Sequence, residues 1–190
     1  MDRYLDVCVA KHAEVVNYLG SSVAAAVVAL GHNKPLRVEA WDLNPLCTMQ
    51  LAVALSGFDK HEVQVSTGPA TPSALSGRPD LLFIDPPDRE GWEKKLVGFC
   101  QHQNAPRSVL EWLPVSGARI NATTGRPQGL TGTWHCTTVI WPNPGGVAQR
   151  TIGCELIYTL PGTAVTALQK AVNEVVALMG GSWTVQHRVL

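Results

Sequence analysis

The chain has 190 residues, of which 45% are hydrophobic and 16% charged, and its 15 basic and 15 acidic residues give a formal net charge of zero. This composition excludes a disordered or fibrous protein and leaves room for one domain of ordinary size, so we expect residues 1–190 to form a single domain. A neutral chain also argues against a protein that holds nucleic acid by phosphate neutralisation alone, although a local basic patch is compatible with it.

The cysteines and histidines show no pattern typical of a metal site or a disulfide framework. The 5 cysteines are widely separated and form no Cys-x-x-Cys pair, and the 6 histidines have no metal-ligand spacing. This usage favours reduced thiols in a cytoplasmic protein and predicts no metal. The longest apolar run, 23–30, is too short to span a bilayer and no signal-peptide pattern precedes it, so we expect no membrane association.

The first elements alternate between strand and helix. Val15–Leu19 is a candidate strand, a turn through Gly20 follows, and Val23–Leu30 is an apolar helix with Ser21 or Ser22 as its cap. A glycine turn before a helix offers backbone N–H groups that suit a carboxylate or a phosphate. Such turns are common, so this one does not identify a ligand site by itself.

Polar residues follow the next two expected strands. Strand Leu36–Trp41 ends at Asp42, and strand Glu62–Ser66 ends at Thr67 and Gly68. In nucleotide-binding α/β domains, an acid about twenty residues after the glycine turn accepts the ribose hydroxyls. The end of the third strand would then lie beside an adenine ring. The alternative is that Asp42 caps the following helix, and the two roles are compatible.

The most informative stretch is the apolar run Leu81–Ile84, which is followed by Asp85, Pro86 and Pro87. The run predicts a strand buried on both faces, which the two prolines end because they cannot donate to a β ladder. Asp85 is therefore expected at the carboxyl edge of a sheet, where open α/β sheets bind their ligands. The alternative is an Asp that merely caps a proline-rich turn.

Strands dominate the second part of the chain. Helix Glu90–Gln103 is expected after the prolines, and strand Ser108–Pro114 after the helix. The stretch Ser116–Gly132 has no apolar period and predicts a long loop. Its candidate substrate contacts are Arg119, Asn121, Arg126 and Gln128, and the alternative is a solvated connection without a role. The remaining expected elements are strands Thr133–Trp141 and Ile152–Leu160, joined as a hairpin, helix Thr163–Met179 and a last strand Trp183–Val189.

This order of elements predicts an α/β fold with a doubly wound, mostly parallel sheet and a C-terminal antiparallel hairpin that contributes one antiparallel strand. In such a sheet the loops after successive strands meet at one edge. Each polar residue has a common structural explanation when taken alone, but their order along the chain is improbable by chance. The residues expected to converge are Gly20, Ser21, Asp42, Thr67, Gly68 and Asp85.

Four motifs resemble, in order, those of the bacterial large-subunit (23S) ribosomal RNA adenine-N6 methyltransferases. They are Tyr18–Ser22, Asp42–Pro45, Asp85–Pro87 and Trp112–Val115. Asp-Pro-Pro after a buried strand is also typical of amino-group methyltransferases that act on adenine, cytosine or glutamine. The resemblance implies a class I, Rossmann-like methyltransferase fold, S-adenosylmethionine as the cofactor and RNA, ribosomal or other, as the partner.

The resemblance also implies roles for single residues. Trp92 is the candidate for stacking on the target base, because Asp88 occupies the position where the family has an aromatic residue. The implied cofactor contacts are Gly20, Ser21, Asp42, Thr67 and Gly68; the implied catalytic residues are Asp85, Pro86 and Pro87; and the implied substrate contacts are Trp92, Arg119 and Arg126.

Two other functions stay open. Asp88, the neutral charge and the lack of the family's upstream two-histidine segment before Val15 favour a catalytically inactive or truncated methyltransferase-fold module that acts by binding. A methyltransferase for a small molecule or a protein glutamine fits the neutral charge better than one for ribosomal RNA. The sequence leaves the oligomeric state undetermined.

Overall fold

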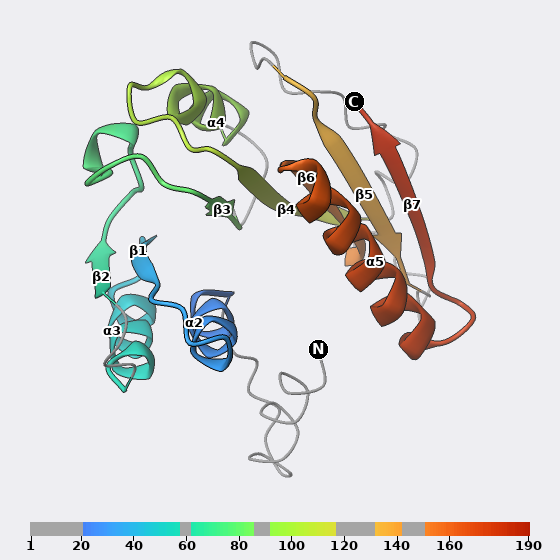
Figure 1. Cartoon of the computed structure of the whole chain (residues 1–190), viewed down its shortest axis with the longest axis horizontal. Helices are drawn as coiled ribbons and strands as arrows, with labels where there is room; N and C mark the ends of the chain where they lie inside the picture. The colour runs from blue at the N-terminus through green and yellow to red at the C-terminus, as the bar shows by residue number, and fades with distance from the viewer. Residues whose placement is uncertain (1–20, 58–61, 86–91, 117–131, 142–150) are drawn as a thin grey trace. The chain divides into compact units, whose positions relative to one another are not determined.

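The computed structural model describes residues 21–57, 62–85, 92–116, 132–141 and 151–190. The chain divides into two compact units, Met1–Ala70 and Thr71–Leu190, and each is described by itself (Figure 1). The strand expected at Val15–Leu19 and most of the loop expected at Ser116–Gly132 lie outside the described residues.

The first unit contains a strand–helix–strand motif preceded by a helix. Its elements are α2 (Ser21–Gly31), β1 (Arg37–Asp42), α3 (Pro45–Leu55) and β2 (Glu62–Thr67). β1 and β2 pair in parallel, as a helical crossover requires. Buried Ala26 of α2 and buried Leu55 of α3 form a small core with apolar residues of both strands. The alternation of strand and helix expected for this part of the chain is therefore confirmed.

The second unit is built around a five-stranded sheet of order β3-β4-β6-β5-β7. β3 and β4 are parallel, whereas β6 is antiparallel to both β4 and β5. The expected hairpin of β5 and β6 is therefore confirmed. A short 3-10 helix (Pro72–Ala74) precedes the sheet. The strands are β3 (Leu82–Ile84), β4 (Val109–Ser116), β5 (His135–Ile140), β6 (Thr151–Thr159) and β7 (Thr184–Val189).

The expectation of one antiparallel strand is wrong, because β7 is also antiparallel to β5. The cause is helix α5 (Gly162–Met179), which connects β6 to β7. A helical crossover returns the chain in the direction of the strand before it. Since β6 already runs against β5, β7 does so too. The sheet is thus a mixed α/β sheet, and a doubly wound arrangement of the whole chain stays a prediction.

Helices cover both faces of this sheet. Helix α4 (Trp92–Gln101) buries Leu96 and Phe99. Leu96 belongs to the same core cluster as Ile157 of β6, whereas the hydroxyl of the next residue, Tyr158, is bonded to Gln169 of α5. Successive residues of a strand point to opposite faces. Therefore α4 and α5 lie on opposite faces of the sheet.

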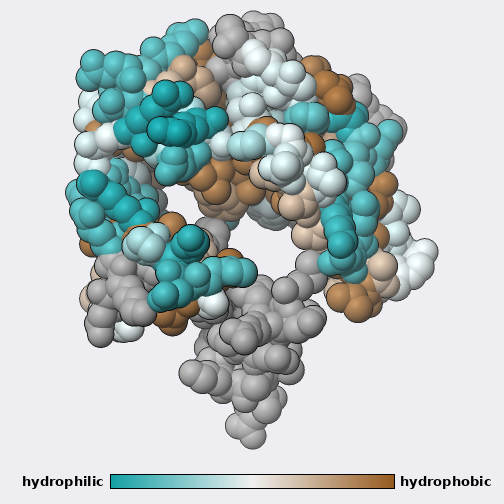
Figure 2. Space-filling view, viewed as in Figure 1, coloured by the Kyte–Doolittle hydropathy of each residue, from teal (hydrophilic) through white to brown (hydrophobic). Residues whose placement is uncertain are grey.

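Hydrophilic and hydrophobic residues are interspersed over the visible surface (Figure 2). Apolar side chains that reach solvent include Leu46 and Met49 of α3, which are 62% and 57% exposed. Within the described ranges, no helix combines the length and the apolar character needed to cross a membrane.

Candidate functional site

The ends of the two strands in the first unit bring candidate polar residues together. Asp42 and Thr67 are the last residues of β1 and β2, and they are partners in the parallel register. The backbone N–H of Gly68 donates to the backbone carbonyl of Asp42 at 2.9 Å. The structure therefore brings Asp42, Thr67 and Gly68 together at the carboxyl edge of this sheet, and their role in holding a cofactor stays a prediction.

The carboxylate of Asp42 is oriented by the start of the next helix. Its Oδ1 accepts a hydrogen bond from the backbone N–H of Asn44 at 2.7 Å. Asn44 is the N-cap of α3, and its own Oδ1 accepts from the backbone N–H of Leu46 at 3.0 Å. The idea that Asp42 itself caps this helix is wrong, because Asn44 takes that role. Asp42 is exposed, so its carboxylate faces solvent in a fixed direction.

A buried hydroxyl on α3 supports the end of β2. Thr48 is only 6% exposed, and its Oγ1 lies 2.8 Å from Oγ1 of Thr67. Thr48 also donates to the backbone carbonyl of Pro45 at 3.0 Å. Sequence reasoning missed Thr48. The available signal was a β-branched hydroxyl in the first turn of the helix, where Thr commonly bonds back to the preceding turn.

Gly68 has a backbone conformation that favours glycine. Its φ is +131°, and no heavy atom lies within 4 Å of the position that a Cβ would take. The glycine is thus required by the turn and not by crowding. The turn brings the Gly68 N–H back to Asp42, and Pro69 has no N–H to offer.

The glycine turn before α2 is described only in part. α2 is described from Ser21 onward, and Gly20 lies outside the described residues. The expectation of Ser21 or Ser22 as the cap stays a prediction. The role of Gly20 and Ser21 in holding a cofactor stays a prediction.

In the second unit, Asp85 directly follows β3, at the carboxyl end of that strand. Asp85 is exposed, yet partial desolvation still raises the pKa of its carboxyl above the ordinary value of 3.8. A carboxylate with a raised pKa is a better proton acceptor than an ordinary one. Pro86 and Pro87 lie outside the described residues.

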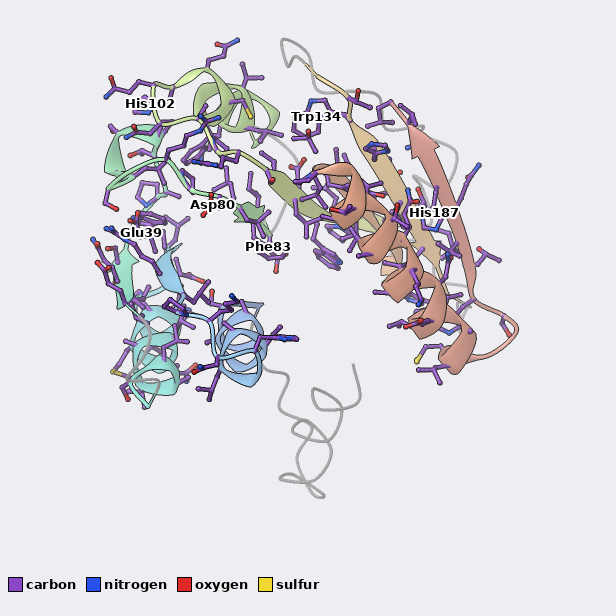
Figure 3. All side chains as sticks on the ribbon, in the orientation of Figure 1. Glu39, Asp80, Phe83, His102, Trp134 and His187 are labelled. Atoms are coloured by element: carbon purple, nitrogen blue, oxygen red, sulfur yellow. The ribbon has the colours of Figure 1, made fainter. Side chains whose placement is uncertain are left out.

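The strand that carries Asp85 is less buried than the sequence indicates. Ile84 is 4% exposed, but Phe83 is 38% exposed, so burial on both faces is wrong for this strand (Figure 3). Ile84 pairs with Glu111 of β4, whose side chain is 1% exposed. Glu111 is a buried acid opposite Ile84, the residue before Asp85, and sequence reasoning missed it because its neighbours in Val109–Val115 are mostly apolar.

The proposed substrate contacts are not tested by the structure. Trp92 is the first residue of α4, and its side chain is not described. Arg119 and Arg126 lie outside the described residues. In the part of the chain that the structure describes, no group of three His, Cys, Asp or Glu side chains is arranged to hold a metal ion.

Comparison with known structures shows that the fold of this chain is similar to that of a solved protein. The chain is similar to the crystal structure of protein LPL1258 from Legionella pneumophila str. Philadelphia 1, of family DUF519, with 17% identity and a TM-score of 0.65 over 97% of this chain and 72% of that one. No family model matches the sequence. No curated protein matches it either. The structure of LPL1258 thus shows that the fold described above occurs in a known protein.

Two further structures have lower scores. One is a putative methyltransferase, yhhF, from Escherichia coli, with 14% identity and a TM-score of 0.42 over 77% of this chain and 91% of that one. The other is the 23S rRNA methyltransferase ErmE, with 14% identity and a TM-score of 0.41 over 83% of this chain and 78% of that one.

Proposed function

We propose that the protein is an S-adenosylmethionine-dependent methyltransferase for an exocyclic amino group, with adenine N6 in RNA as the target. The observation that carries the proposal is Asp85, an acid with a raised pKa at the carboxyl end of a strand and followed in sequence by Pro86 and Pro87. Ligands of open α/β sheets bind at this end of the strands.

The pairing of the strands supports a doubly wound order. In such a sheet, numbered 3-2-1-4-5-6, the second strand pairs with the third and the fourth with the fifth, all in parallel. If the strand expected at Val15–Leu19 is counted first, the parallel pairs β1·β2 and β3·β4 are these two pairs. We therefore keep residues 1–190 as one methyltransferase-like domain in this proposal.

The residues of the first unit suit the nucleoside part of the cofactor. Oδ1 of Asp42 is held by Asn44, and an exposed carboxylate fixed in this way can accept both ribose hydroxyls. Thr67 and Gly68 are proposed to lie beside the adenine ring, and Gly20 and Ser21 to contact the remainder. When bound, S-adenosylmethionine supplies a methyl group carried by a positively charged sulfur.

Asp85 is the proposed catalytic residue. The lone pair of an exocyclic amino group is delocalised into the ring, so the nitrogen becomes a good nucleophile only when acceptors bind its hydrogens. The carboxylate of Asp85 provides one acceptor, and the backbone carbonyl of Pro86 is proposed as the other. Holding the nitrogen in line with the methyl group accounts for much of the rate enhancement.

RNA is the proposed partner because the four ordered motifs resemble those of ribosomal RNA adenine-N6 methyltransferases. A paired base must leave its stack before it can react, and Trp92 is proposed to stack on the extruded base. Arg119 and Arg126 are proposed to contact phosphates. These two side chains would provide a local charge that the neutral chain lacks as a whole.

Calorimetric titration with S-adenosylhomocysteine tests the cofactor site. We expect binding in about the micromolar range. Asp42→Ala should abolish it, and Asp42→Asn, which keeps an acceptor for the Asn44 N–H, should weaken it. The matched control is Asp80→Ala, because Asp80 is exposed and forms only a surface ion pair with Arg107 at 3.2 Å. Its affinity should equal that of the wild type.

Methyl transfer to RNA tests the reaction. Wild-type protein with labelled cofactor should label unmodified ribosomal RNA at adenine N6, and Asp85→Ala should not. Binding without transfer to any RNA would contradict the RNA substrate and direct the search to small molecules or protein glutamine. Absence of cofactor binding would contradict the enzyme altogether and favour a module that keeps the fold and acts by binding.

A further inference from the structure

The hydroxyls of Thr48 and Thr67 form a hydrogen bond, and the number of hydrogens that each can donate bears on which of them is the donor. A hydroxyl has one hydrogen to donate and two lone pairs to accept with. Thr48 donates its hydrogen to the backbone carbonyl of Pro45 at 3.0 Å, and a carbonyl can only accept. Either oxygen of the 2.8 Å pair could donate, and when Thr48 also makes its bond to Pro45 the donor must be Thr67.

The direction of this bond determines what Thr67 can do for a ligand. Thr67 is exposed at the end of β2, and its single hydrogen is directed to the buried Thr48. Its remaining lone pair can then only accept a hydrogen bond. The adjacent backbone adds no donor, since the Gly68 N–H is bonded to Asp42 and Pro69 has none. Neither of the two residues after Thr67 therefore offers a free backbone donor beside its oxygen.

We infer that Thr48 is a positioning residue that makes Thr67 select a nucleoside base with an amino group over one with a carbonyl at the same position. The inference rests on the proposed function, because it assigns the adenine of the cofactor to this strand end. An amino group donates to the Thr67 oxygen. A carbonyl in its place would put two acceptors next to each other, and turning the Thr67 hydrogen towards that carbonyl would break its bond to Thr48.

The test is calorimetric titration with S-adenosylhomocysteine and with its 6-oxo analogue, S-inosylhomocysteine. We expect wild-type protein to prefer the amino compound by at least about tenfold, because a mispaired polar group costs more than a missing contact. Thr48→Val has nearly the same shape but cannot hold the Thr67 hydrogen, so the preference should fall towards one. Thr48→Ser keeps the hydroxyl and should restore the preference.

A third ligand distinguishes the effect of the group at position 6 from the effect of the hydrogen on ring nitrogen N1. The 6-oxo analogue also carries a hydrogen on ring nitrogen N1, whereas the purine analogue with hydrogen at position 6 keeps N1 unchanged. We expect the purine analogue to bind wild-type protein with an affinity between those of the other two ligands. Its affinity should change little in Thr48→Val, because it has no group for Thr67 to recognise.

The possible outcomes separate this inference from the proposed function. If wild-type protein binds both compounds equally, or if Thr48→Val weakens both by the same factor, Thr48 has only a structural role and the inference is wrong while the cofactor site stands. If wild-type protein binds none of the three ligands, the site and the inference are both wrong. Thr67→Val gives a second route, since it should remove the preference without touching the buried Thr48.

Discussion

Arg188 of β7 donates to Oε1 of Glu155 on β6 at 3.1 Å, across the strand that separates them. The intervening strand β5 contributes Cys136, whose sulfur lies 3.4 Å from the Arg188 guanidinium. Thr138, also on β5, donates to the same Glu155 oxygen at 3.3 Å. The exposed fractions of the Arg188 and Glu155 side chains are 23% and 10%. The pair therefore joins three strands on one face of the sheet.

Removing the arginine should destabilise the second unit. Arg188→Met leaves a buried carboxylate without its charged partner, so we expect the free energy of unfolding to fall by about 2 kcal/mol. The matched control is Arg107→Met, which breaks the exposed ion pair with Asp80 and should cost less than about 0.5 kcal/mol. Urea unfolding of both variants measures the difference. Equal losses would show that the buried pair contributes no more than the exposed one.

The opposite face of the sheet carries a buried chain of polar side chains. Thr137 is fully buried, and its Oγ1 lies 2.9 Å from the Tyr158 hydroxyl and 2.8 Å from Nδ1 of His187. His187 lies on β7 beside α5 (Figure 3), and its Nε2 is 3.2 Å from Oδ1 of Asn173. Thr137→Val removes the central hydroxyl and should lower the free energy of unfolding by about 1–3 kcal/mol.

Conservative replacement distinguishes the lost hydrogen bonds from altered packing. Thr137→Ser keeps the hydroxyl and loses one methyl group, so it should cost less than Thr137→Val. Thermal or urea unfolding of the two variants gives the comparison. If the serine variant is the less stable one, packing of the methyl group and not the polar chain stabilises this face.

This polar chain explains one failure of sequence reasoning. In the sequence of α5, apolar residues at helical spacing predict one buried face: Ala164, Leu168, Ala171, Val175 and Met179. Val175 and Met179, however, are 43% and 55% exposed. The face that meets the sheet instead includes Val165 and Val176, both 9% exposed. Asn173, with Gln169, lies along this face and bonds to side chains of the sheet. A pattern of apolar residues cannot show that polar residues have buried partners on distant strands.

The strands and helices themselves were largely predictable, because turn residues and apolar periods are local signals. Strand direction was not, since the orientation of β7 depends on β6 and the α5 crossover together. Within the candidate site, Asp42 and Thr67 could be placed at strand ends from sequence. Thr48 could not, because its role depends on a hydroxyl 19 residues away in the chain. The convergence of Asp42 with Asp85 stays a prediction.

The cysteines should differ widely in reactivity. Cys47 is exposed, whereas burial raises the pKa of the Cys100 thiol to about 11. At pH 8 only about one in a thousand Cys100 thiols is then ionised, so alkylation there should be slow and should accelerate as the pH rises. Iodoacetamide labelling followed by peptide mass spectrometry should find Cys47 modified before Cys100. The thiol pKa values of Cys136 and Cys154 are also raised by burial, and both should react slowly.

Unfolding provides the control for this experiment. In urea the Cys47 and Cys100 thiols should be labelled at similar rates, because burial no longer suppresses ionisation. Labelling of Cys100 as fast as that of Cys47 in the folded protein would contradict the burial of α4 against the sheet.

We expect the Asp85 carboxylate to lower the stability of the folded protein and to be required for methyl transfer. Its carboxyl pKa is raised in the folded protein, so between the unfolded and folded pKa values the native state binds more protons than the unfolded state. The free energy of unfolding therefore falls as the pH rises through this window, and the full cost is present at pH 7. Asp85→Asn cannot ionise, so we expect the variant to be more stable than the wild type at pH 7 while methyl transfer falls by about a hundredfold or more.

The pH dependence separates this effect from a general gain in packing. The stability advantage of Asp85→Asn should shrink as the pH falls from 7 towards about 4, because the wild-type carboxyl then becomes protonated. Asp80→Asn is the matched control, since Asp80 is exposed and paired with Arg107, and it should show no gain at pH 7. Urea unfolding at several pH values supplies both curves. If Asp85→Asn is less stable than the wild type at pH 7, the carboxylate stabilises the fold and its position at the end of β3 has a structural cause.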